Sequence, residues 1–247
     1  LLNNQFTIFE RGVKGLNVEK DIVFPDSYLI PMDPSGQKNI LEADKMIRLL
    51  LTNGIAVKKA NAAFYAGGRE YPAGTFVVPM KQGLRGLANT MLWKAEDISG
   101  QAAAMYDISA YSFPELCGFD AIAVSKSLDV SLSDVDEAPA LTGTMDAAEA
   151  RYYIMPVQNN DAYFVANSLV RDGFAVYRTS EANGAYDPGS FVIQNVGGIR
   201  PELEKLISGS AVTVKSIQSV KGKLLPVKLQ KVAVVDIDGG TATEIKA

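Results

Sequence analysis

The sequence predicts an α/β fold built from two repeated β-α-β-β-α units, with Rossmann-like or glutamine amidotransferase-like mixed sheets. Three observations lead to this prediction. Short apolar runs alternate with segments of helical periodicity, the same order of elements occurs twice, and a glycine ends the main helical segment in both halves. Strands that alternate with helices are typical of a largely parallel or mixed sheet.

Residues 1–27 are expected to form an N-terminal helical connector, and residues 28–126 the first unit, which opens with an apolar strand at 28–31. A helix follows, because four apolar residues have the i, i+3, i+4, i+7 spacing of one helix face. These residues are Ala43, Met46, Ile47 and Leu50. Asn53-Gly54 supplies the left-handed stop that ends helices. The remaining elements expected in this unit are strands at 55–57 and 75–78 and a helix at 82–93.

The second unit spans residues 151–229 and repeats this order. Asn159 or Asn160 is a candidate N-cap, and Asp172-Gly173 ends the helix. The helix has the same apolar spacing, through Ala162, Val165, Ala166 and Leu169. The helix and the strand that follows it lie 119 residues after the corresponding elements of the first unit. The Tyr-x-x-Gly turn lies 115 residues after the corresponding turn. The alternative is that any two β-α-β units look alike. The other expected elements are strands at 152–156, 174–176 and 190–193 and a helix at 200–207.

Residues 127–150 differ in composition from both units and are interpreted as an acidic, solvated linker with a boundary near Pro139. The segment contains six acidic residues and no basic one. A calcium loop is the alternative, but Asp134–Glu137 lacks the glycine and the spacing of an EF-hand.

Residues 230–247 are expected to be the truncated start of a following α/β domain, because Val232–Val235 reads as a buried strand. The next residues, Asp236-Ile-Asp238-Gly, resemble the nucleophile motif of haloacid dehalogenase-type phosphatases. That chemistry needs a lysine and further acidic residues on later strands, and only nine residues follow Asp238. An ordinary turn is therefore the simpler interpretation.

Composition narrows the functional classes. The chain has 247 residues, 24 basic and 28 acidic, and its formal charge is −4. The mild acidity argues against nucleic acid as a partner. No apolar run approaches the ~18–20 residues that span a bilayer, so no transmembrane segment is expected.

Histidine is absent, and Cys117 is the only cysteine. These facts exclude a Ser-His-Asp triad, a Cys-His dyad, a histidine-ligated zinc site and an internal disulfide within this chain. As the nucleophile of a glutamine amidotransferase-like site, Cys117 would lack its histidine base, so a buried structural thiol is favoured. The sequence thus predicts no catalytic residue, no metal ligand and no cofactor in this chain.

Two segments resemble a known family. Residues 66–78 read AGGREYPAGTFVV, which is similar to a GGRxYPAGxxVV signature, and residues 106–118 read YDISAYSFPELCG, which is similar to the run that follows it. Both occur downstream of the peptidase domain in large secreted bacterial zinc carboxypeptidases of the carboxypeptidase A type. The chain therefore resembles, over most of its length, the C-terminal non-catalytic region of this family.

In that family a His-x-x-Glu pair and a later histidine hold zinc, and a glutamate acts as base. No position of this chain matches them, so the resemblance implies that zinc and catalysis belong only to a missing upstream peptidase domain. It also implies that this upstream domain of the same polypeptide is the partner, and that the protein is secreted or held in the cell envelope.

The leading functional hypothesis is an accessory segment that supports the peptidase domain or shapes substrate access. The alternative is a small-ligand or carbohydrate-binding module with a site between the two units, lined by Arg69, Tyr71 and Tyr186. A third and weaker hypothesis is an independent enzyme that uses carboxylates alone.

Overall fold

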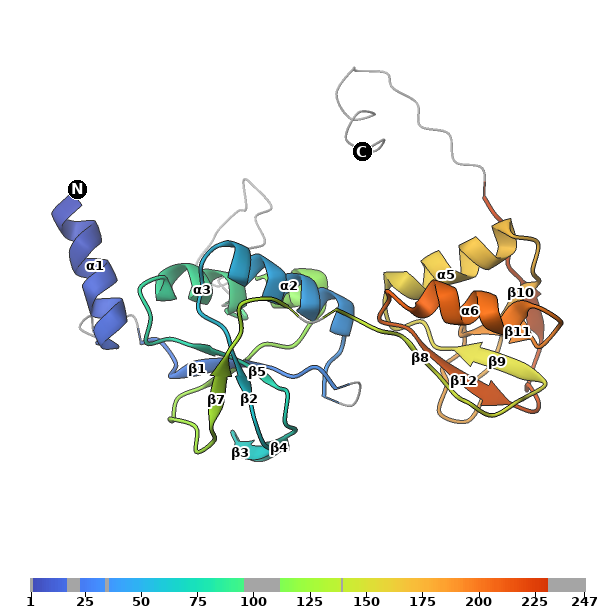
Figure 1. Cartoon of the computed structure of the whole chain (residues 1–247), viewed down its shortest axis with the longest axis horizontal. Helices are drawn as coiled ribbons and strands as arrows, with labels where there is room; N and C mark the ends of the chain where they lie inside the picture. The colour runs from blue at the N-terminus through green and yellow to red at the C-terminus, as the bar shows by residue number, and fades with distance from the viewer. Residues whose placement is uncertain (1, 17–22, 34–35, 96–111, 139, 231–247) are drawn as a thin grey trace, which may run out of the picture. The chain divides into compact units, whose positions relative to one another are not determined.

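The computed structural model describes residues 2–16, 23–33, 36–95, 112–138 and 140–230 (Figure 1). Within them the fold is mixed α/β, with six helices and three mostly antiparallel sheets. The chain divides into two compact units, of which the first extends to Thr142 and the second begins at Gly143. None of the described helices combines the length and the apolar character needed to cross a membrane.

The first unit contains a five-stranded sheet in the order β6-β1-β5-β2-β7, in which every pairing is antiparallel. A two-stranded hairpin of β3 and β4 accompanies it. The strands are β1 (Ser27–Ile30), β2 (Lys58–Ala60), β3 (Phe64–Ala66), β4 (Arg69–Tyr71), β5 (Phe76–Pro79), β6 (Ile122–Val124) and β7 (Leu132–Asp134). The helices are α1 (Leu2–Lys14), α2 (Ile40–Thr52), α3 (Arg85–Leu92) and α4 (Phe113–Cys117).

This sheet is covered on both faces, which explains why its central strands are apolar at successive positions. One face packs against α2 and α3, which lie together on one side of the sheet (Figure 1). On that face Tyr28 of β1 stands opposite Val78 of β5. The other face carries Leu29 and Val77 and packs against the hairpin residues Phe64 and Tyr71. The hairpin is thus part of the core and not a surface loop.

The second unit contains a six-stranded sheet in the order β13-β10-β11-β9-β12-β8. Its only parallel pair among the described strands is β12 with β8. Two helices, α5 (Asn160–Arg171) and α6 (Ile199–Ile207), cover one face (Figure 1). The strands are β8 (Thr144–Met145), β9 (Tyr152–Met155), β10 (Val176–Thr179), β11 (Phe191–Gln194), β12 (Thr213–Ile217) and β13 (Leu224–Pro226).

The expected helix faces are confirmed. All eight residues of the two i, i+3, i+4, i+7 sets are buried in the cores. Asn159 is the N-cap of α5, and its side chain accepts a hydrogen bond from the backbone N–H of Asp161 at 3.0 Å. Gly54 and Gly173 follow the two helices with φ of 74° and 90°, as the left-handed stop requires.

Largely parallel or mixed sheets were expected, and the sheets that the structure describes are mostly antiparallel, with β12 and β8 as a parallel pair in the second unit. β1 and β2 run in the same direction, but β5 lies between them and is antiparallel to both. The helix therefore connects two strands that are not neighbours, which is the split β-α-β arrangement. In the second unit β11 lies between β9 and β10 in the same way. A later strand that inserts into a β-α-β unit leaves no mark on the periodicity of that unit, so the pattern could not predict it.

The two units share their connectivity beyond these three strands. The outer neighbours of β1 and β2 are β6 and β7, and the outer neighbours of β9 and β10 are β12 and β13. Turn details also correspond, because the N–H of Gly74 donates to Ala60 O and the N–H of Gly189 to Thr179 O, each at 2.8 Å. Both glycines have φ of 90°.

The interpretation of residues 127–150 as a solvated linker needs correction. β7 pairs with β2 in the first sheet, and β8 pairs with β12 in the second. These are edge strands of two or three residues, and short polar edge strands resemble linkers in sequence. The division between the units falls inside this segment. Pro139 itself, residues 106–111 of the second family-like run and the motifs at 232–240 lie outside the described residues.

Candidate functional site

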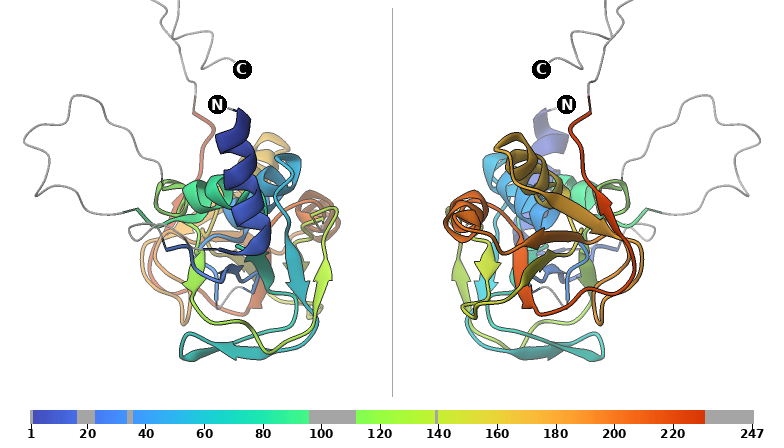
Figure 2. Two further views of the ribbon diagram at one scale, coloured as in Figure 1. Left: turned by 90° about the vertical axis from the view of Figure 1, so that its left-hand side faces the viewer. Right: turned by 90° about the vertical axis from the view of Figure 1, so that its right-hand side faces the viewer.

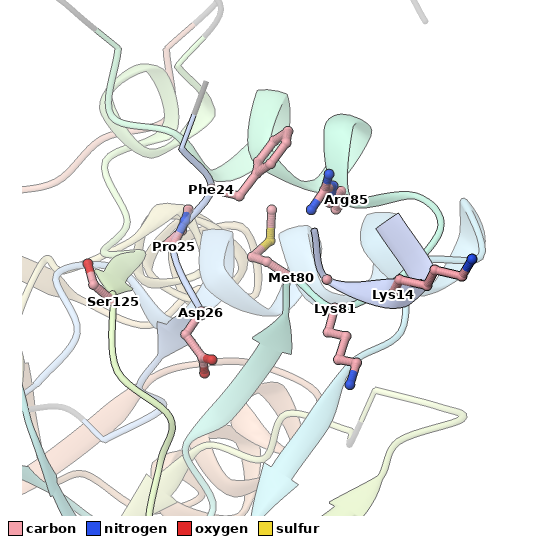
Figure 3. Close-up of a pocket in the computed structure, with 9 residues that line it drawn as sticks. Lys14, Phe24, Pro25, Asp26, Met80, Lys81, Arg85 and Ser125 are labelled. Atoms are coloured by element: carbon pink, nitrogen blue, oxygen red, sulfur yellow. The ribbon is translucent and has the colours of Figure 1, made fainter. Parts of the chain in front are cut away.

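A cavity of about 280 Å³ opens in the first unit (Figure 3). It lies where the C-terminal end of α1, the segment before β1, the end of β5 and the start of α3 meet. Its lining residues are Lys14, Gly15, Phe24, Pro25, Asp26, Met80, Lys81, Arg85 and Ser125.

The buried side chain of Gln82 shapes this corner. Its amide nitrogen donates to Pro79 O at 2.6 Å and to Ala56 O at 3.2 Å, and its amide oxygen accepts from the Ala56 N–H at 2.8 Å. These hydrogen bonds fix the turn from β5 into α3, and α1 packs against the same turn. A Cβ added at Gly12 would lie 2.5 Å from Gln82 O, so only glycine lets the helix backbone approach this closely.

Arg85 is the central charged group of the cavity. Its side chain is only 9% exposed, its guanidinium carbon lies 4.5 Å from the centre of the Phe24 ring, and its Nη2 donates to Leu16 O at 2.6 Å. Burial, with a smaller contribution from the charge of Arg11, lowers the pKa of Arg85. An arginine nevertheless remains charged at neutral pH. Arg85 therefore joins the end of α1 to α3 through a largely buried cation.

The charges around the cavity favour an anion over a cation, since three lining residues are basic and Asp26 is the one acidic residue among them. The side chains do not converge, however. The Lys14 amine pairs with Glu10, and the amines of Lys14 and Lys81 point away from Arg85 (Figure 3). Asp26 accepts a hydrogen bond from Ser127 Oγ at 3.2 Å. The arrangement can bind a polar or anionic group, but it presents no paired acid and base for catalysis.

Of the site residues expected from the sequence, the structure brings Arg69 and Tyr71 together. The Arg69 guanidinium carbon lies 4.5 Å from the centre of the Tyr71 ring, which also stacks on Phe64 at 5.5 Å. Tyr71 is only 1% exposed, and burial raises the pKa of its hydroxyl. Tyr186 belongs to the second unit, where its backbone pairs with that of Asn183.

The sequence analysis missed the residues of the cavity. A signal for one of them is present, because Arg85, Ala88 and Leu92 have the i, i+3, i+7 spacing of a buried helix face and all three are buried. A charged residue at such a position needs a partner or a specific environment. Phe24, Asp26 and Ser125 carry no such signal, because they lie in loops that the fold brings to this corner.

The second unit has a related corner without a comparable cavity among those described. Arg200 lies 115 residues after Arg85, and its Nη2 donates to the backbone oxygen of Asp146 at 2.9 Å. The Asp146 carboxylate accepts from the Ser216 N–H and from Lys215, each at 3.0 Å. These two donors hold the pKa of Asp146 below its ordinary value. The ionised carboxylate therefore ties the segment after β8 to β12.

Cys117 and the acidic residues offer no alternative centre. Cys117 is partly buried, and burial, supported by the charge of Glu42, raises the pKa of its thiol, which disfavours the nucleophilic thiolate. Within the part of the chain that the structure describes, no group of three or more His, Cys, Asp or Glu side chains is arranged to hold a metal ion.

Comparisons with known proteins return no match: no family model, no curated protein and no solved structure is significantly similar to the chain.

Proposed function

We propose that the chain is a non-catalytic accessory segment of a zinc carboxypeptidase-like hydrolase, where it supports the peptidase domain or shapes substrate access. The proposal starts from the resemblance of residues 66–78 and 106–118 to the region downstream of the peptidase domain. It includes a secreted or cell-envelope location for the parent protein, in a bacterium, and zinc only in the peptidase domain.

One observation carries this proposal: within the family-like motif at 66–78, Tyr71 and residues 75–78 are buried in the first unit, whereas residues 67–70, 72 and 73 are exposed. Tyr71 is buried against Phe64, and Gly74 forms the turn into β5 through its N–H bond to Ala60 O. Residues that fill a core and close a turn support folding and are not available to a substrate. Resemblance at such positions therefore favours a shared scaffold over a shared reaction.

We further propose that the two units are copies of one duplicated β-α-β-β-α unit. Their common strand connectivity supports this, as do the matched glycines at 74 and 189. The side chains beside these glycines correspond as well. The hydroxyl of Thr75 donates to Pro72 O at 2.8 Å, and the hydroxyl of Ser190 donates to Asp187 O at 2.7 Å. Two copies of a packed unit suit a spacer or support, because neither copy needs to contribute a reactive group.

The alternative function is a small-ligand-binding module, and the cavity beside Arg85 favours it. The basic lining selects anionic small molecules as candidate ligands. Calorimetric titration of the chain with citrate, as a multivalent carboxylate probe, would test this function. Binding that is lost in Lys81→Glu and retained in Lys205→Glu, which lies outside the cavity, would favour the module over the accessory segment.

The accessory role is tested on the parent protein. The coding sequence upstream should specify a His-x-x-Glu pair and a later histidine. We expect the peptidase domain expressed without residues 1–247 to retain zinc and cleave small peptides, but to lose thermal stability or activity on large substrates. An upstream region without these ligands, or a truncated enzyme indistinguishable from the whole protein, would contradict the proposal.

A further inference from the structure

Helix α1 exposes the apolar side chains that the structure describes between residues 5 and 14. Phe6 is 68% exposed, Phe9 51% and Val13 49%, and these three residues lie on one face at i, i+3 and i+7. At the edge of this stripe, the Phe9 ring packs on Gly83 of the first unit. Figures 1 and 2 show α1 standing beside the layer formed by α2 and α3. The stripe is therefore largely exposed.

A helix of this length needs a covered face. α1 has 13 residues, and isolated helices shorter than about 12–15 residues are marginal in water, so their stability comes from packing of the apolar face. The contacts of α1 with the first unit include those of Gly12 and Gly15, which have no side chain, and of Phe9. Phe6 and Val13 remain largely exposed. A further surface that covers the stripe would supply the missing stabilisation.

We propose that the stripe of Phe6, Phe9 and Val13 is a self-association surface that binds α1 of a second copy of this chain in antiparallel orientation. The spacing of the apolar residues along α1 is the reason for choosing a second copy of the chain as the partner. When two copies are related by a two-fold axis between residues 7 and 8, Phe6 faces Phe9 of the second copy and Phe9 faces Phe6. The spacing of Phe6, Phe9 and Val13, three and then four residues apart, is that of the apolar seam of a two-helix coiled coil.

Charge is consistent with this pairing. Arg11 and Lys14 lie off the stripe, and Glu10, the charged residue nearest to it, is paired with Lys14 of its own helix. The seam therefore brings together no like charges. A lipid surface is a less suitable partner for the stripe. Helices that lie in a membrane interface carry many lysines and arginines on their polar face, whereas the polar face of α1 also contains Gln5, Thr7 and Glu10.

The area sets the strength of the interaction. With about 200 Å² for a whole aromatic side chain, exposures of 68% and 51% leave about 240 Å² on Phe6 and Phe9 together. With Val13, two copies bury on the order of 600 Å², about half of the 1,200 Å² at the lower limit of stable interfaces. The dimer is therefore reversible, with a dissociation constant in the micromolar range or weaker.

The test is sedimentation equilibrium of the full chain over a wide range of concentrations. We expect a shift from the 26.5 kDa monomer towards a species of twice that mass. Phe6→Glu should raise the dissociation constant at least about tenfold, as loss of a central apolar anchor does. Ile8→Glu is the matched control, because Ile8 lies on the same helix, is 63% exposed and is off the stripe. It should associate as the unchanged chain does, and circular dichroism should show both variants folded.

Disulfide formation tests the orientation in a Cys117→Ser background. A mixture of Phe6→Cys and Phe9→Cys chains should form the mixed dimer rapidly, whereas Val13→Cys alone should not, because the two copies of residue 13 lie at opposite ends of the seam. A monomer at every concentration, equal effects of the two glutamate variants, or rapid linking of Val13→Cys overturns the proposal. So does binding to phosphatidylcholine–phosphatidylserine vesicles without self-association, which would assign the stripe to a membrane.

Discussion

At the scale of single residues, Gly74 and Gly189 show most clearly how backbone geometry restricts the sequence. Each adopts φ of 90°, a region that side chains other than glycine rarely enter, and each donates its N–H across the turn that precedes a central strand. A Cβ at Gly74 would meet nothing within 4 Å. The requirement there is thus conformational and not a matter of space.

Gly74→Ala should therefore lower the free energy of unfolding of the first unit by about 1–2 kcal/mol, which is the cost of a left-handed conformation for alanine. Gly86→Ala is the control, since Gly86 lies in α3 with open space around it and without a positive φ. That change should raise stability by about 0.5–1 kcal/mol, because alanine has the higher helix propensity. Urea unfolding measures both, and equal effects of the same sign would contradict the account of this turn.

At the scale of elements, the helices were predictable and the sheets were only partly so. The helix faces and their glycine stops follow from spacing, and both appear where expected. The apolar runs at 55–57 and 174–176 were expected to be strands, but β2 and β10 begin at Lys58 and Val176. Ile55 and Val57 are buried, but they lie just before β2, and the residues of β2 that pair in the sheet include polar ones. Burial and sheet pairing are separate properties, and apolar periodicity reports only burial.

The same limit applies to the cavity. The position of Arg85 on a buried helix face could be predicted from the spacing of residues. The other segments that line the cavity lie next to β1, β5 and α1, which are distant in the sequence. Antiparallel insertion of β5 between β1 and β2 creates this meeting point, and no local pattern encodes that insertion. Sequence reasoning therefore named Arg69, Tyr71 and Tyr186 as candidate site residues and missed the cavity beside Arg85.

The contact between β8 and β12 provides a prediction of pH dependence. Because the folded-state pKa of Asp146 is lowered, its stabilising contribution is complete above the unfolded aspartate value of about 3.9 and is lost as pH falls through the lower folded value. Asp146→Asn should cost about 1 kcal/mol at pH 7, since the group is partly screened by solvent. The difference from the unchanged chain should begin to shrink below about pH 4 and should close once the pH is below the lowered folded pKa of Asp146. Exposed Asp129→Asn is the control, and a gap that persists at low pH would refute the ionic explanation.

At the scale of the whole molecule, each unit has its own hydrophobic core. Leu50 and Leu169 are fully buried at corresponding helix positions, one in each core. Alanine at either position should destabilise its own unit by about 2–5 kcal/mol. The single tryptophan, Trp93, lies in the first unit and reports on it alone.

In urea, the Trp93 fluorescence transition should move to lower concentration in Leu50→Ala and stay in place in Leu169→Ala. Far-UV circular dichroism should detect destabilisation in both variants. If Leu169→Ala shifts the Trp93 transition as far as Leu50→Ala does, the units unfold as one cooperative body and the description as two independent cores is wrong.

The proposed function is that this chain supports a metallopeptidase and performs none of its chemistry. A catalytic zinc needs about three protein ligands, and without histidine only one thiol and the carboxylates remain, which favour magnesium or calcium over zinc. The most direct test is elemental analysis of the purified chain after zinc loading and gel filtration, with a carboxypeptidase assay on the same sample. We predict no stoichiometric zinc and no release of C-terminal residues. One zinc per chain together with chelator-sensitive carboxypeptidase turnover would contradict the account.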